Sequence, residues 1–414
     1  MTERVQPIAA SQRIPLLDIL RGTAIFGILA VNMPLMNAPV TTMLASIRLW
    51  EGLPDRIMEV VIKLFFEGKF YTLFSLLFGY GFWLFLNKPV SEGRTILPLY
   101  ARRVFILLLI GILHMVLLWA GDILIFYALF GFLLILFRKA SDRKIFRWAL
   151  AFILIPIILT VLMTLMFSLA SMDPKAAAEI QAGMNAQVER LNAQVMTALD
   201  VYARGSFAEI VGMRITEWLT LLPGLLFFYP NVMAMFLLGM LAARRGILAD
   251  IEKHLPAFRK IFRWGLIIGL PANIIFAWVS YHGQPGDPTW PNALGVLCFG
   301  FGGPALTLAY ISGIALLFRR GFLKPAADRL ASVGRMALTN YLMQSIIGAI
   351  LFHSYGFALY GKVSIWQSFL LTMVIFAVQA ALSPLWLRRF RFGPAEWVWR
   401  SLTYLKPQPM KSTK

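Results

Sequence analysis

Several apolar windows of about 18 residues or more run along this chain of 414 residues, and they limit the folds that are open to it. Windows of this length are typical of helices that cross a lipid bilayer, since about 20 helical residues span the hydrocarbon core. Hydrophobic residues make up 59% of the chain and charged residues only 14%, against about a quarter in soluble domains. The sequence therefore predicts an all-α, polytopic integral membrane protein.

About ten transmembrane helices are predicted from these windows. They lie at about 15–34, 65–86, 103–121, 122–138, 147–170, 220–243, 261–281, 292–318, 334–353 and 365–387. The predicted organisation is a cytoplasmic tail (1–14), a first group of five helices (15–170), an extracytoplasmic segment (171–218), a second group of five helices (219–390) and a cytoplasmic interfacial tail (391–414).

The basic residues predict the orientation of these helices. If the N-terminus is cytoplasmic, 29 of the 39 Lys and Arg residues fall in cytoplasmic segments and 7 in extracytoplasmic ones. Cytoplasmic loops of membrane proteins carry such an excess of positive charge, so both termini are predicted to be cytoplasmic. The same clustering accounts for the net charge of +19 without a nucleic-acid partner.

The extracytoplasmic segment carries the pattern of an amphipathic helix. Asp173 is a predicted N-cap, and Pro174 fits the first helical position. Apolar residues then recur at helical spacing, at Ile180, Met184, Val188, Leu191, Val195 and Leu199. We expect a helix that lies on the membrane surface or caps the bundle, with a binding site for a specific partner as the alternative.

Several classes of functional site have no signature in this sequence. The single cysteine, Cys298, excludes an internal disulfide framework. The four histidines are scattered and none has metal-ligand spacing to Cys, Asp or Glu, so no metal site and no bound cofactor are predicted. No dinucleotide fingerprint, P-loop or serine nucleophile elbow is present at a strand-to-helix turn.

His114 is a polar residue that lies inside one of the apolar windows. It lies 11 residues after Arg103, which is about 16 Å along a helix and close to the bilayer midplane. An imidazole at that depth can accept a proton, and we interpret it as a candidate base. Asp122 follows at the next turn, where it is a candidate helix N-cap, a role that is compatible with orienting His114. A direct contact between the two requires a break in the helix at Gly121.

Other charged or polar residues interrupt the first two predicted helices. Asp18 and Arg21 are spaced i,i+3 and can pair at the inner end of the first helix, as an architectural or a functional ion pair. Asn32 falls near the outer end of that helix. Glu67 and Lys69 flank Gly68 near the outer end of the second, as a surface pair or as the polar rim of an outer cavity.

Glycine and proline mark two places where a helix is expected to be kinked or broken, LPGLLFFYPN (222–231) and CFGFGGPALT (298–307). Kinks that serve packing are one reading, and broken helices that line a cavity are the other. On the cytoplasmic side, arginines cluster at the membrane edge and are candidates for binding phosphate groups, at Arg102, Arg103, Arg335, Arg388 and Arg391.

The stretch RIPLLDILRGTAIFGILAVNM resembles the first helix of the YeiB-like bacterial membrane proteins, a family without an assigned function. The likeness continues through FFEGKFYTLFSLLFGYGF, RRVFILLLIGILHMVLLWAGDILIFYALFG, GRMALTNYLMQS and WLRRFRFGPAEWVWRSLTY, so it covers the chain from end to end. This resemblance implies a multi-pass protein of the bacterial cytoplasmic (inner) membrane. In FGPAEWVWRSLTY we expect a short interfacial helix from Pro394, with Glu396 and Arg400 as an i,i+4 pair.

The first two helices are also similar to those of the transmembrane acyltransferase superfamily, which includes the heparan-α-glucosaminide N-acetyltransferases. That similarity implies transfer of an acyl group from cytoplasmic acyl-CoA, with acetyl-CoA one candidate co-substrate, to an extracytoplasmic acceptor. The glucosaminide acetyltransferases carry a catalytic histidine in the loop after the first helix, whereas Pro34 to Phe66 contains none here. Either His114 takes that role or this branch transfers no acyl group.

Two functions remain open from the sequence. The first is an acyltransferase in which His114 is the base, Asp122 sets its tautomer, and the cytoplasmic arginines bind the CoA phosphates. The second is a proton-coupled transporter or exporter of a small molecule, with Asp18, Arg21, His114 and Asp122 along the proton path. The expected partners are membrane lipids and a small-molecule or glycan acceptor, and a homodimer is left open.

Overall fold

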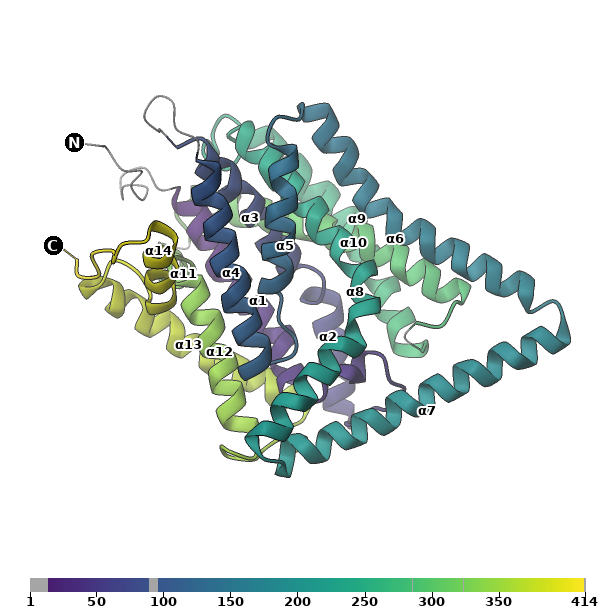
Figure 1. The fold of residues 1–414 in the computed structure, drawn as a ribbon. Helices are drawn as coiled ribbons and strands as arrows, with labels where there is room; N and C mark the ends of the chain where they lie inside the picture. Colours follow the sequence, from purple (N-terminus) through teal and green to yellow (C-terminus); the bar gives the residue numbers. More distant parts are fainter. Residues whose placement is uncertain (1–13, 89–95, 285, 323, 413–414) are drawn as a thin grey trace.

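The computed structural model describes residues 14–88, 96–284, 286–322 and 324–412, and these residues form an all-α protein (Figure 1). Nearly all of the predicted N-terminal tail lies outside the described residues. The α-helices are α1 (Pro15–Met36), α2 (Leu53–Phe65), α3 (Phe70–Leu86), α4 (Leu97–Leu117), α5 (Leu124–Leu134), α6 (Asp142–Ala170), α7 (Pro174–Arg204), α8 (Phe207–Arg244), α9 (Leu255–His282), α10 (Trp290–Arg319), α11 (Lys324–Arg335), α12 (Ala337–Phe352), α13 (Ile365–Arg389) and α14 (Pro394–Tyr404).

Each of the ten predicted membrane helices corresponds to one helix of the structure, but they are not ten equivalent spans. Within the described residues, six are long and apolar enough to cross a bilayer alone, namely α1, α4, α6, α9, α10 and α13. α8 is a seventh if its two halves, bent by 69°, count as one span. α5 and α12 are apolar but shorter, and they pack within the bundle. The expectation of about ten independent spans therefore exceeds what length supports.

The region around Gly68 differs from the predicted helix at 65–86. The chain forms a separate amphipathic helix, α2, then turns at Gly68 and begins α3 at Phe70. Gly68 has φ +84°, a conformation that glycine adopts without the steric cost of a Cβ. The polar residues Glu67 and Lys69 thus lie at a turn between two helices.

The predicted extracytoplasmic segment is α7 together with the first turns of α8. Asp173 caps α7 as expected, and its carboxylate accepts from the backbone N–H of Lys175 at 3.0 Å. The C-terminal half of α7 packs on the bundle through Leu191, Val195 and Tyr202. Its N-terminal half is largely exposed and extends along one edge of the molecule (Figure 1). α8 begins earlier than predicted, because Ser206 and Glu209 form a capping box.

The two glycine- and proline-containing stretches have different outcomes. α8 bends between Leu225 and Tyr229, within 222–231. α10 runs without a break through 298–307, so a broken helix there was wrong. Its glycines serve close packing instead: a Cβ at Gly302 would lie 2.7 Å from the Cβ of Ala272 on α9.

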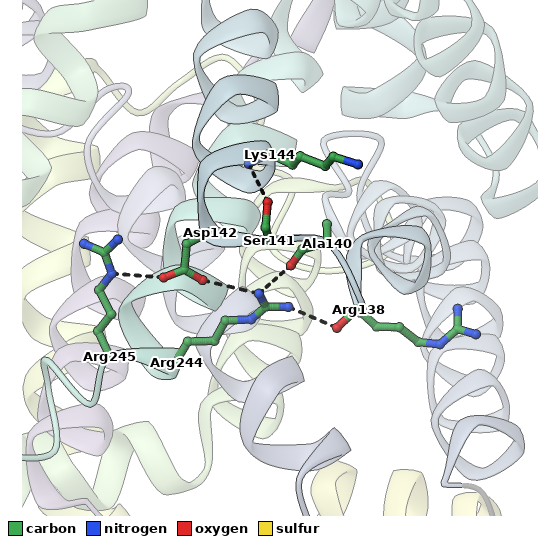
Figure 2. Close-up of polar contacts among 7 residues, drawn as sticks. All are labelled: Arg138, Ala140, Ser141, Asp142, Lys144, Arg244 and Arg245. Carbon is green, nitrogen blue, oxygen red and sulfur yellow. Dashed lines mark hydrogen bonds and ion pairs between the residues drawn. The ribbon is translucent and has the colours of Figure 1, made fainter.

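One end of the bundle gathers the segments that were predicted to be cytoplasmic. The indole of Trp399 in α14 donates to the carbonyl of Arg103 near the start of α4, at 2.8 Å. At the start of α6, Asp142 accepts from Arg244 and Arg245 at the end of α8, at 3.4 and 3.2 Å (Figure 2). Arg244 also donates to the carbonyls of Arg138 and Ala140. These contacts fit the predicted orientation, which itself stays a prediction.

α3 and α8 cross closely enough that only glycine fits at the contact. A Cβ at Gly79 would lie 1.9 Å from the carbonyl oxygen of Phe236, and one at Gly239 would lie 1.9 Å from that of Leu76. The backbones therefore touch at two reciprocal points, which fixes α3 against α8.

We expect Gly79→Ala to lower the thermal unfolding midpoint of the purified protein, because the added methyl group forces two backbones apart at a cost of about 1–3 kcal/mol. Thermal unfolding in detergent is monitored by the loss of the monodisperse chromatography peak. Gly212→Ala on α8 is the matched control, since a Cβ there meets nothing within 4 Å. Equal midpoints for the two variants would contradict this account of the crossing.

Candidate functional site

His114 and Asp122 are in direct contact. α4 ends at Leu117 and the chain reverses before α5 begins at Leu124, which supplies the break that the sequence required. Asp122 Oδ2 lies 2.7 Å from His114 Nδ1, and both side chains are 0% exposed. Asp122 Oδ1 also accepts from the backbone N–H of Ile125 at 2.8 Å, so the same residue caps α5. The two roles expected for Asp122 therefore coexist.

Ser345 of α12 completes a hydrogen-bonded chain with these two residues. Its Oγ lies 2.8 Å from His114 Nε2, and Ser345 is 1% exposed. A carboxylate only accepts, so Nδ1 carries the proton toward Asp122 and Nε2 is left to accept from the serine hydroxyl. This is the hydrogen-bonding order of an Asp-His-Ser catalytic triad.

Sequence reasoning missed Ser345. A signal was present in TNYLMQS, where Asn340, Tyr341, Gln344 and Ser345 place polar groups one turn apart on an otherwise apolar helix. In the structure the four residues are buried on α12. A single serine carries little weight in a sequence because a serine in a membrane helix is readily satisfied by its own backbone.

A cavity of about 320 Å³ lies beside this triad. Its wall is built from α1, α3, α4, the start of α5, the α11–α12 junction, and α14 with the residues before it. Six cationic side chains line it, at Arg21, Lys88, Arg103, Arg335, Arg391 and Arg400. Asp18 and Glu396 are the carboxylates on the same wall.

Aromatic rings contact three of these cations. The guanidinium of Arg103 lies 3.7 Å from the ring centroid of Trp399, and that of Arg400 lies 4.6 Å from Phe392. Lys88 Nζ lies 4.7 Å from the ring of Phe85. A ring face orients a cation without neutralising its charge. The wall therefore keeps a positive potential suited to an anion.

Glu396 does not pair with Arg400 as the sequence predicted. Its carboxylate instead caps α12 from outside that helix: Oε1 accepts from the backbone N–H groups of Leu338 and Thr339, at 2.7 and 3.1 Å. The Thr339 hydroxyl donates to Oε2. The first turn of a helix favours a negative charge, so this contact ties α14 to the start of α12.

The inner end of the cavity reaches the immediate neighbours of the triad. Ile123 and Leu124 follow Asp122 in the chain and line the cavity. Tyr341 lines it too, and its ring centroid lies 5.0 Å from that of His114. His114 itself is 2% exposed and is not part of the cavity wall. One layer of side chains thus separates the imidazole from the cavity.

Some of the other predicted site residues line the cavity, and the rest lie elsewhere in the fold. Asp18 and Arg21 form their ion pair at 2.9 Å and both line the cavity. Of the predicted phosphate ligands, Arg103, Arg335 and Arg391 line it. The Arg102 guanidinium donates to the Thr403 carbonyl at 3.2 Å, and Arg388 is exposed away from the wall.

The predicted outer group lies apart from this cavity, and an outer cavity lined by it stays a prediction. Lys69 is fully buried and donates to the carbonyl of Lys63 at 2.7 Å, so a surface pair with Glu67 was wrong. Asn32 and Glu67 are partly buried, and none of the three lines the cavity described above.

Arg214 was counted only as an extracytoplasmic basic residue, yet it is buried and holds the end of α4. Its Nη1 donates to the carbonyls of Val116 and Leu117, at 3.3 and 2.7 Å, and Nη2 donates to the Tyr355 hydroxyl at 3.0 Å. It thereby fixes the end of α4 at Leu117, three residues beyond His114. Throughout the described parts of the chain, no group of three or more His, Cys, Asp or Glu residues could hold a metal ion.

Residues 242–406 match the model of a family described as a protein of unknown function (DUF418). The sequence is 36% identical to the uncharacterized protein YxaH of Bacillus subtilis (strain 168), in an alignment that covers 99% of each chain. It is 27% identical to the uncharacterized protein YeiB of Escherichia coli (strain K12), over 94% of this chain and 95% of the relative. No solved structure matches the chain. The chain belongs to the YeiB-like family of membrane proteins, whose function is unassigned.

Proposed function

We propose that this protein is a membrane-embedded acyltransferase that uses Ser345, His114 and Asp122 as its catalytic residues. The observation that carries the proposal is the hydrogen-bonded chain of the three side chains, at 2.7 and 2.8 Å, beside a cavity rich in cations. A serine, a histidine and a carboxylate in this order perform acyl transfer on several unrelated folds.

In this proposal the donor is a thioester with a phosphate-bearing head group, of which acyl-CoA is the leading candidate. The phosphates bind the cavity arginines, since a guanidinium binds phosphate in a bidentate manner. The Ser345 hydroxyl attacks the thioester carbonyl while His114 Nε2 takes its proton. The C–S bond then breaks, the thiol leaves with that proton, and the acyl group remains as an ester on Ser345. An acceptor hydroxyl or amine, deprotonated by His114, attacks this ester and regenerates the serine.

Tyr341 has a defined place in this mechanism. It lies between the cavity and the imidazole, so the donor carbonyl reaches Ser345 only when the tyrosine side chain rotates away. Until then the triad is dry, which protects a serine ester from hydrolysis.

Ser345→Ala is expected to abolish formation of an acyl-enzyme and to lower the rate of acyl-CoA turnover by about a thousandfold or more, because the nucleophile is lost. The purified protein is incubated with acyl-CoA, and the acyl adduct is measured by intact-protein mass spectrometry. His114→Gln is expected to act similarly.

Ser368→Ala is the matched control, because Ser368 is a fully buried serine of α13 that lies outside both the cavity wall and the triad. If Ser345→Ala is acylated as fast as the Ser368→Ala control, the triad is not catalytic. Substrate flux in proteoliposomes that needs no acyl donor would instead favour the transporter.

The cavity also predicts a pH dependence of anion binding. Burial, together with the charges of Arg103 and Arg400, lowers the pKa of Lys88 to about 8. A bound phosphate favours the protonated amine, so affinity is full below this pKa and falls as pH rises through about 8.

We expect CoA affinity to fall between pH 7 and pH 9 in the wild type and to change far less in Lys88→Arg, because the guanidinium stays charged. Isothermal titration at several pH values measures this. An equal loss of affinity in both proteins would show that Lys88 does not face the ligand.

A further inference from the structure

The cavity changes character along its length. Its cations lie at the end where α14 meets the starts of α4 and α12. Its inner wall is apolar and aromatic, with Ile25, Ile28, Phe74, Leu77, Phe78 and Leu107. On α3 alone the wall runs from Phe85 to Phe74, eleven residues or about 16 Å of helix.

The inner part offers more apolar surface than a short acyl group covers. A donor of the acetyl type leaves more of this wall uncovered than a donor with a long acyl chain, and apolar surface in a protein interior is normally packed at high density. An alkyl chain would fill it, and each methylene group moved from water into such a site adds to affinity. The combination of a cationic outer end and an apolar inner end matches an amphiphile.

Gly81 shapes the space between these two parts. It lies on the cavity wall of α3, and a Cβ built on it would find Arg21 Nη2 as its nearest neighbour, at 3.8 Å. That distance is ordinary van der Waals contact, so the backbone has room for a side chain that would project into the cavity. Gly81 thus leaves the passage from the head-group end to the inner end open.

We propose that the cavity binds an amphiphile whose phosphate-bearing head lies among the six cations and whose long acyl chain packs on the apolar inner wall. This inference rests on the proposed function for the place of the acyl group, but binding itself requires no turnover. Two sources carry this chemistry: a long-chain acyl-CoA that arrives from water, and an anionic phospholipid that arrives from the bilayer.

The test measures binding in the Ser345→Ala protein, which isolates recognition from catalysis. The protein is placed in phosphatidylcholine nanodiscs and titrated with acetyl-, butyryl-, hexanoyl- and octanoyl-CoA. Octanoyl-CoA is expected to bind at least about 100-fold more tightly than acetyl-CoA, because six methylene groups are added and full burial gains about fourfold for each, about 4,000-fold in all. Equal affinity along the series overturns the proposal.

Two variants test separately where the acyl chain and the head group bind. Gly81→Leu is expected to remove the gain in affinity with chain length. Lys88→Met is expected to weaken all four ligands by the same factor. Gly212→Leu on the exposed face of α8 is the control for a large side chain at a helical glycine.

A Gly81→Leu protein that keeps its thermal midpoint and the full chain-length dependence shows that the chain lies elsewhere. Replacing part of the phosphatidylcholine with phosphatidylglycerol then separates the two sources. Loss of octanoyl-CoA affinity identifies a bilayer phospholipid as an occupant, whereas unchanged affinity identifies the soluble thioester. Amphiphile binding without acyl transfer by the wild type would refute the proposed function and leave this inference standing.

Discussion

The hydrogen-bonded chain from Asp122 through His114 to Ser345 is the contact on which the rest of the site depends. In an apolar bundle an unpaired polar group costs several kcal/mol, so these side chains must find one another. Doing so fixes the end of α4, the start of α5 and the middle of α12 at one point. Arg214 reinforces this by binding the last carbonyls of α4. The same constraint that stabilises the bundle also orders a serine, an imidazole and a carboxylate.

The cavity gathers charge instead, since six cations and two carboxylates line it. Aromatic rings contact Arg103 and Arg400, while the Glu396 carboxylate accepts from the start of α12. Asp18 is paired with Arg21. The ion pair of Asp18 and Arg21 in the first membrane helix thus has an architectural place on the wall of this cavity, where we propose that an anion binds.

The presence of membrane helices could be predicted from the sequence, because an apolar segment long enough to cross a membrane can adopt few other folded structures. The contact of His114 with Asp122 was predictable in outline from Gly121 and from their spacing. Ser345 was not, since its partner lies 231 residues away on α4 and no local pattern encodes such a distance. The burial of Lys69 and the cap formed by Glu396 could not be predicted from the sequence for the same reason. Both depend on which helices meet in space, whereas the sequence displays only neighbours along the chain.

α12 connects the cavity wall to the triad. Its first turn is bound by Glu396 of α14, and α14 carries Trp399 and Arg400 of the cavity wall. Tyr341 and Ser345 follow on the same helix, and Thr339 to Ser345 is about 9 Å of helical rise. In the proposed function, a donor bound through Arg400 therefore acts on the start of the helix that carries both the tyrosine cover and the serine. Under the same proposal, donor binding displaces Tyr341, so that the triad is uncovered only when an acyl group is present to use it.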